Sequence, residues 1–226
     1  MVQKRIAPLA LTLLASAALA TATSVADWTA WHHLFKPLTL LIALLMVARH
    51  SPAAPSGKNW LIAALAASLA GDVFLMFEGF FIPGLVSFLL AHLAYIVLLR
   101  QDAPWFPNRR ALMATLGVGA AMYAFLWFGG LPAALRLPVG VYVGVIALMA
   151  AQALGRASLL HSPAARMVAA GASLFMLSDS LLATNKFVLP LPLSQLWVLG
   201  SYYAAQMLFV GGWMRGLACR AINADN

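Results

Sequence analysis

The sequence predicts an all-α fold, a polytopic bundle of about eight transmembrane helices formed by residues 1–226 as a single domain. Of the 226 residues, 63% are hydrophobic and 9% are charged, whereas a soluble domain has roughly 25% charged residues. Several apolar stretches approach the ~20 residues with which a helix crosses a bilayer core of ~30 Å. None of them shows the strict apolar–polar alternation of a half-buried strand.

The expected helices follow one another along the whole chain. Short breaks of proline, glycine or charged residues separate the apolar stretches, as in SPAAPSGK at 51–58, QDAPWFPNRR at 101–110 and LPLPL at 189–193. Such residues end helices. In chain order, the helices are expected at about 6–24, 34–49, 59–77, 80–99, 111–128, 132–151, 164–185 and 193–214.

The basic residues lie mainly between these stretches and predict an orientation. If the N-terminus is cytoplasmic, only Lys36, Arg136 and Lys186 fall on the outer side. The other eleven fall on the cytoplasmic side, as the excess of Lys and Arg in cytoplasmic loops requires: Lys4, Arg5, Arg49, Lys58, Arg100, Arg109, Arg110, Arg156, Arg166, Arg215 and Arg220. We therefore expect an integral protein of a bacterial cytoplasmic (inner) membrane with both termini in the cytoplasm.

The first stretch also has an alternative interpretation. Lys4 and Arg5, the apolar run and the small residues Ala18-Leu19-Ala20 match a cleavable signal peptide. Cleavage there would leave seven spans and an outer N-terminus.

Charge and cysteine content exclude several kinds of site. The net charge is +8, but the basic residues do not form a patch interleaved with aromatic residues, so we expect contacts with membrane lipid and no nucleic acid. Cys219 is the single cysteine, which excludes an intrachain disulfide and a thiolate metal site. Among the histidines only His92 lies well inside a span, and no metal-binding spacing is present, so no metal site is expected.

Two aspartates lie within the expected spans. Asp72 and Asp179 each sit five to seven residues from the outer end of an apolar helix, at a depth of ~8–10 Å. An aspartate in a membrane costs several kcal/mol unless it is paired, hydrated or protonated, and such residues usually serve function. The alternative is that each caps a helix end or satisfies a polar neighbour.

The surroundings of the two aspartates suggest a weak four-plus-four repeat. Asp179 follows Asp72 by 107 residues, and Tyr202 follows Tyr95 by the same interval, one helix further on in each half. The helices of the two aspartates run in the same direction, as a parallel duplication requires.

Other polar residues inside or at the ends of the spans are candidates for a site. His92 and Tyr95 lie one turn apart on one helix face, and Gln206 follows Tyr202 by one turn. Lys36 and Asn185 fall in the outer half together with the two aspartates, which predicts a polar cavity reached from that side, with Lys36 and Lys186 at its rim. Such residues also have ordinary explanations. A histidine can be a buried core residue, tyrosines are common at the membrane interface, and lysines near helix ends extend their charged groups toward water.

These residues resemble the YhhN family, whose animal members are lysoplasmalogenases. The resemblance covers about 34–214 and rests on residues in several spans: Lys36-Pro37, Gly71-Asp72, Leu75-Met76, Gly84, Phe88, Ala91-His92, Tyr95, Gly171, Phe175, Ser178-Asp179-Ser180, Asn185, Tyr202-Tyr203 and Ala205-Gln206. It implies about eight transmembrane helices, no cofactor, and hydrolysis of the vinyl ether bond of lysoplasmalogen. The products are a fatty aldehyde and glycerophospho-ethanolamine or -choline.

The chemistry of that bond suits two carboxyl groups. A vinyl ether hydrolyses by protonation at carbon, which gives an oxocarbenium ion to which water adds. One carboxyl must therefore be protonated near neutral pH while the other is ionised, a division that a carboxylate pair provides. We expect Asp72 and Asp179 to be this catalytic pair. The lysophospholipid would be bound by the surrounding polar side chains: Lys36, His92, Tyr95, Ser178, Asn185, Tyr202 and Gln206.

Two other functions use buried aspartates. An intramembrane aspartyl protease has its second aspartate in a Gly-x-Gly-Asp context, which neither Leu69-Ala70-Gly71-Asp72 nor Leu177-Ser178-Asp179 provides. A proton-coupled small-molecule transporter or channel would use Asp and His as proton relays. No proline breaks the helix before either aspartate, which argues against the interrupted helices of such transporters.

Overall fold

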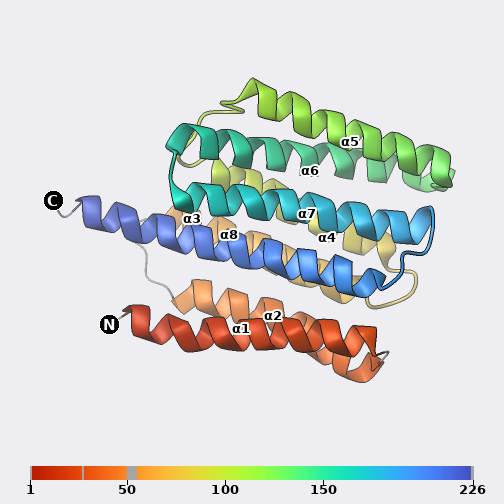
Figure 1. The fold of residues 1–226 in the computed structure, drawn as a ribbon, viewed down its shortest axis with the longest axis horizontal. Helices are drawn as coiled ribbons and strands as arrows, with labels where there is room; N and C mark the ends of the chain where they lie inside the picture. Colours follow the sequence, from red (N-terminus) through yellow and green to blue (C-terminus); the bar gives the residue numbers. More distant parts are fainter. Residues whose placement is uncertain (1, 27, 50–54, 225–226) are drawn as a thin grey trace.

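The protein forms a bundle of eight α-helices, seen in a computed structural model that describes residues 2–26, 28–49 and 55–224 (Figure 1). The described part of the chain contains no strand, so the predicted all-α fold class is confirmed. The helices are α1 (Val2–Val25), α2 (Thr29–Arg49), α3 (Pro55–Phe74), α4 (Phe81–Leu99), α5 (Arg109–Gly129), α6 (Ala133–Leu160), α7 (Pro163–Phe187) and α8 (Ser194–Ala224).

The helices lie roughly along one axis and alternate in direction (Figure 1). The pair α1–α2 packs on one side of the bundle, and the pair α5–α6 packs on the other. Between them, α3 packs on α4 and α7 packs on α8. The chain begins and ends at the same end of the bundle, which places the C-terminal ends of α3 and α7 together at the opposite end.

The outer surface of the bundle is apolar. Within the residues that the structure describes, five helices are long and apolar enough to cross a membrane, namely α2 from Ala30, α4, α5, α6 and α7, and a shorter apolar segment covers Leu11–Val25 of α1. Large apolar side chains on this surface face outward, and Phe128 is 88% exposed. In water such a surface would aggregate, whereas lipid solvates it. The protein is therefore an integral membrane protein.

Two helices extend well beyond their predicted ends. The eighth helix was expected to end at 214, but α8 continues to Ala224. We expected the sixth helix to end at 151, but α6 continues to Leu160. The extension is stable because its polar side chains bind the loop between α4 and α5. The Nε and Nη2 atoms of Arg156 each lie 2.6 Å from a carboxylate oxygen of Asp102, and Gln152 bonds to the backbone of Phe106 and Pro104. Buried polar groups are tolerated when they are paired in this way.

Close contact between α7 and α8 depends on glycine. A Cβ atom at Gly171 would lie 2.9 Å from the carbonyl oxygen of Ala205 and 3.2 Å from the Cβ of Leu208. Small residues allow helices in membranes to approach at this distance. The contact holds the seventh and eighth helices together, one of which contains Asp179 and the other Tyr202.

We expect Gly171→Ala to lower the thermal unfolding midpoint of the detergent-purified protein. The added methyl group must push α8 away from α7, and overpacking of this kind costs about 1–3 kcal/mol. The matched control is Gly200→Ala, also in the α7–α8 pair, where a Cβ atom meets no described atom within 4 Å. An equal midpoint for both variants would contradict the proposed role of Gly171.

Candidate active site

Asp72 lies near the C-terminal end of α3 and is 2% exposed. Its Oδ1 atom is 3.6 Å from the Nζ of Lys36 on α2. Its Oδ2 atom accepts a hydrogen bond of 2.8 Å from the hydroxyl of Tyr202 on α8. A buried carboxylate requires this kind of compensation. Asp72 is therefore paired with a cation and with a hydrogen-bond donor.

Asp179 has a different partner. It is partly buried on α7, and its Oδ2 atom accepts a hydrogen bond from the hydroxyl of Tyr142 on α6. Among the residues that the structure describes, no Lys, Arg or His side chain forms an ion pair with Asp179. The two aspartates therefore differ in the charge of their surroundings.

Both aspartates, which lie toward the C-terminal ends of α3 and α7, line one polar cavity of about 260 Å³. Five helices contribute most of its walls: α2, α3, α4, α7 and α8. The polar residues that line the cavity are Ser24 of α1 and, on these five helices, His32, His33, Lys36, Asp72, Ser178, Asp179, Gln195 and Tyr202. The polar cavity that was predicted to be shared by Lys36, Asp72, Asp179 and Asn185 is thus present, but Asn185 does not line it.

The partners of the two aspartates occupy comparable places in the two halves of the chain. Lys36 is on the second helix and Tyr142 on the sixth, 106 residues later, whereas Asp72 and Asp179 are 107 residues apart. This agreement is consistent with the four-plus-four repeat. In this comparison, Lys36 beside Asp72 in the first half corresponds to Tyr142 beside Asp179 in the second half.

A hydrogen-bonded chain extends from Asp72 into the core. Tyr202, which donates to Asp72, accepts a hydrogen bond of 3.4 Å from the Nε2 of Gln206. The Oε1 of Gln206 accepts a hydrogen bond of 2.6 Å from the hydroxyl of Tyr95 on α4. All three side chains are buried, so this network fixes the position of the Tyr202 hydroxyl.

Residues 31–213 match the family model of the YhhN family. The chain belongs to the YhhN family. The resemblance inferred from the sequence is thereby confirmed, and the match spans seven helices, from α2 to α8.

Several proteins that are similar to this YhhN protein are named lysoplasmalogenases. A Bos taurus protein named lysoplasmalogenase TMEM86A is 34% identical over 149 residues, which are 64% of this chain and 60% of the relative. The Mycobacterium tuberculosis protein named lysoplasmalogenase is 30% identical over 194 residues, 82% of this chain and 72% of the relative. A Homo sapiens protein, lysoplasmalogenase TMEM86B, is 31% identical over 156 residues, 68% of this chain and 64% of the relative. No solved structure shows a significant match.

The match to the mammalian TMEM86A proteins spans about 60% of their length. The family model establishes family membership for this chain, and the residues that line the polar cavity establish the cavity.

The structure separates the predicted site residues into three groups. Lys36, Asp72, Ser178, Asp179 and Tyr202 line the polar cavity. Lys36 is 9% exposed and pairs with Asp72, so it lies inside the cavity and not at its rim. The Ser178 hydroxyl donates a hydrogen bond of 2.9 Å to the carbonyl oxygen of Val198, which ties α7 to α8.

His92, Tyr95 and Gln206 form a second group in the core behind the cavity. His92 is fully buried, and its Nδ1 lies 2.6 Å from the carbonyl oxygen of Phe88. Its ring meets the rings of Tyr142 and Phe175 at centroid distances of 5.4 and 4.7 Å. His92 therefore packs against the phenol that binds Asp179.

Asn185 and Lys186 lie elsewhere. The Oδ1 of Asn185 accepts a hydrogen bond of 2.8 Å from the backbone N–H of Leu191, which orders the connection between α7 and α8. Asn185 is not among the residues that line the polar cavity. The Nζ of Lys186 lies over the Phe81 ring, 4.9 Å from its centroid.

Five polar residues that line the polar cavity or bind an aspartate were missed from the sequence. They are Ser24, His32, His33, Tyr142 and Gln195. Tyr142 is a polar residue within an apolar helix, as Tyr95 is. This feature of the sequence could have identified Tyr142 as a candidate. His32 and His33 precede Lys36 by about one turn on α2, so helical spacing places them near the same cavity.

Proposed function

We propose that this YhhN protein is a membrane hydrolase that cleaves the vinyl ether bond of lysoplasmalogen. The products would be a fatty aldehyde and glycerophospho-ethanolamine or -choline. The observation that supports the proposal best is the placement of two carboxyl groups with unlike partners on one cavity. The names of the matched relatives support the same reaction.

The unlike partners support different roles for the two aspartates. The ammonium group of Lys36 compensates a negative charge on Asp72, so Asp72 is the base. Asp179 has an uncharged phenol as its partner, and a carboxyl group without a counter-ion in an apolar environment favours its neutral form. Asp179 is therefore the acid.

The proposed reaction begins with proton transfer from Asp179 to the second carbon of the alkenyl chain. Positive charge develops on the first carbon and the ether oxygen, beside the carboxylate of Asp72. Water adds to the first carbon and gives a proton to Asp72. The hemiacetal then breaks its bond to the glycerol oxygen, which takes the proton from Asp72, while the hemiacetal hydroxyl returns its proton to Asp179. Both aspartates regain their starting states.

The remaining polar residues would position the substrate and the two aspartates. Tyr142 and Tyr202 orient the carboxyl groups, and Tyr95 and Gln206 support Tyr202. His32, His33 and Gln195 stand at the cavity where a polar headgroup would lie. The charge distribution supports a site that opens toward the outer side of a bacterial inner membrane. The matched relatives have enzyme names, which do not favour the transporter alternative.

The direct test is mass spectrometry of products formed by the detergent-purified protein. Incubation with a lysoplasmalogen is expected to release aldehyde, whereas an ester lysophospholipid and a saturated alkyl ether analogue are expected to stay intact. In D₂O, with immediate reduction of the aldehyde to the alcohol, one deuterium from solvent should appear at the second carbon. A folded protein that released no aldehyde, or that released fatty acid from the ester lipid, would contradict the proposal.

Tyr142→Phe tests the positioning of the proposed acid. Removing the phenol hydroxyl leaves Asp179 without its described hydrogen-bond donor. We expect kcat to fall about 10- to 100-fold, which is no more than the lower limit of the 10²- to 10⁴-fold contribution of a general acid because Asp179 itself remains, with KM nearly unchanged and the pH–rate profile altered. The control is Tyr123→Phe, whose hydroxyl donates to the Arg136 carbonyl outside the polar cavity. Equal pH–rate profiles for Tyr142→Phe and the unmodified protein would exclude this role.

A further inference from the structure

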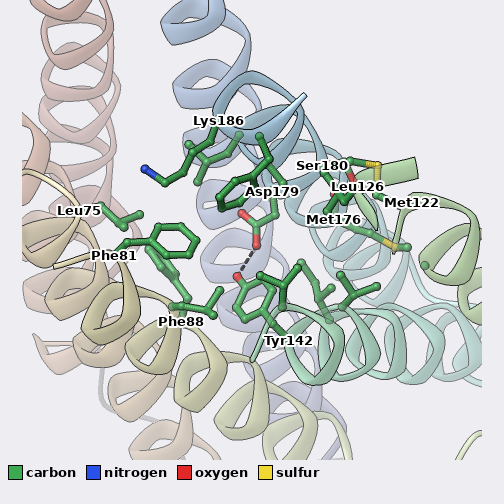
Figure 2. A pocket seen from close by; sticks show the side chains of 18 residues that line it. Leu75, Phe81, Phe88, Met122, Leu126, Tyr142, Met176, Asp179, Ser180 and Lys186 are labelled. Carbon is green, nitrogen blue, oxygen red and sulfur yellow. Dashed lines mark hydrogen bonds between the residues drawn. The ribbon is translucent and has the colours of Figure 1, made fainter. Parts of the chain in front are cut away.

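We propose that the apolar cavity between α4, α5, α6 and α7 binds the alkenyl chain of the substrate. Figure 2 shows the side chains that line this cavity, among them Asp179 and Tyr142 with the hydrogen bond between them. The inference rests on the proposed function and adds the site that would select the substrate by the length of its chain.

The walls of this cavity suit a hydrocarbon. They consist of apolar side chains with few polar groups, and those groups already have partners. The Ser180 hydroxyl donates to the carbonyl oxygen of Met176, and the Tyr142 hydroxyl donates to Asp179. The amine of Lys186 lies over the Phe81 ring. A polar ligand would therefore find few free hydrogen-bonding groups, whereas a hydrocarbon gains from burial.

The apolar cavity adjoins the polar cavity. Four residues line both of them, namely Leu75, Phe88, Asp179 and Leu182. A lysoplasmalogen has the same division, because its vinyl ether bond joins a polar glycerophospho group to an apolar chain. A molecule with its headgroup beside Lys36 and its chain in the apolar cavity would place this bond at the shared wall, where Asp179 is the ionisable group.

The dimensions and composition of the apolar cavity favour a thin, flexible ligand. Its volume is about 70 Å³, against about 260 Å³ for the polar cavity. Met122 and Met176 form part of its wall, and Figure 2 shows their side chains on the same side of the cavity. Methionine side chains adapt to irregular ligands. An unbranched hydrocarbon chain is therefore the expected occupant.

Substitutions in the wall away from Asp179 test the proposal by chain length. Ile146→Ala enlarges the cavity from α6, and Met122→Phe narrows it from α5. Each buried methylene group contributes about fourfold to affinity. In assays with alkenyl chains of increasing length, we expect Ile146→Ala to raise the ratio of kcat/KM for long over short chains. Met122→Phe should lower that ratio about tenfold, the effect of nearly two methylene groups.

The matched control is Ile96→Ala, which removes the same side-chain volume from a buried position on α4 that does not line this cavity. It is expected to lower thermal stability and to leave the ratio unchanged. The proposal would be overturned if the ratio of kcat/KM for long over short chains in Ile146→Ala and Met122→Phe, as in Ile96→Ala, equalled that of the unmodified protein.

A binding measurement separates this proposal from the proposed reaction, because it needs no turnover. A saturated alkyl ether lysophospholipid with a photoreactive diazirine at the chain end is incorporated with the protein in lipid nanodiscs. Cross-linking is expected in peptides of α5 and α6, and less in Met122→Phe. Cross-links spread over lipid-facing helices, unchanged in Met122→Phe, would overturn the chain site even if aldehyde is released. Cross-links in α5 and α6 without aldehyde release would instead contradict the reaction alone.

Discussion

Asp179→Asn is expected to lower kcat for vinyl ether hydrolysis about 10³-fold, within the 10²- to 10⁴-fold contribution of a general acid. The carboxamide cannot give a proton to carbon, so the oxocarbenium ion does not form. Its oxygen can still accept the hydrogen bond from Tyr142, so the thermal unfolding midpoint should change little. Aldehyde release by purified protein, measured together with that midpoint, checks both expectations.

Two further variants show whether the loss reflects chemistry at Asp179. Asp179→Glu keeps the acid but moves it by one methylene group, and we expect activity between that of Asp179→Asn and that of the unmodified protein. Glu78→Gln removes an exposed carboxyl group from the turn between α3 and α4 and should leave kcat unchanged. A folded Asp179→Asn protein with nearly full activity would exclude Asp179 as the acid.

Lys36→Met should have the second large effect, on both stability and activity. Methionine has a similar length but no charge, so Asp72 would keep its hydrogen bond to Tyr202 and lose its counter-ion. Breaking a buried ion pair in this way costs about 3–5 kcal/mol. We expect a lower unfolding midpoint and at least 100-fold slower aldehyde release, because an uncompensated Asp72 is driven toward its neutral form and cannot act as base.

The double variant Lys36→Met/Asp72→Asn separates these two effects. It removes both charges, so the unfolding midpoint should recover toward that of the unmodified protein while the activity stays lost. Lys58→Met is the lysine control, because Lys58 lies 14 residues before Asp72 on α3, ~21 Å along the helix. If Lys36→Met had the unfolding midpoint of the unmodified protein, or if the double variant were no more stable than Lys36→Met, the ion pair would not be the reason for burying Lys36.

The sequence by itself determined the helices and the two central carboxyl groups. Apolar stretches of suitable length can satisfy their backbone in lipid only as helices, and the expected helix at 80–99 is observed as Phe81–Leu99. Asp72 and Asp179 were identifiable because a carboxyl group inside such a stretch is costly. Both conclusions depend on local composition, which is readable along the chain.

Only the tertiary structure decided which side chains meet. The hydroxyl of Tyr202 reaches Asp72 across 130 residues of sequence, and Tyr142 binds Asp179 from the preceding helix. Such contacts depend on the rotation and register of packed helices, which glycines such as Gly171 set through close approach. The same packing placed Asn185 against Leu191 and extended α6 through the pair Arg156–Asp102. Helical periodicity shows which residues share one face of a helix. Which neighbouring helix that face contacts depends on how all eight helices pack together.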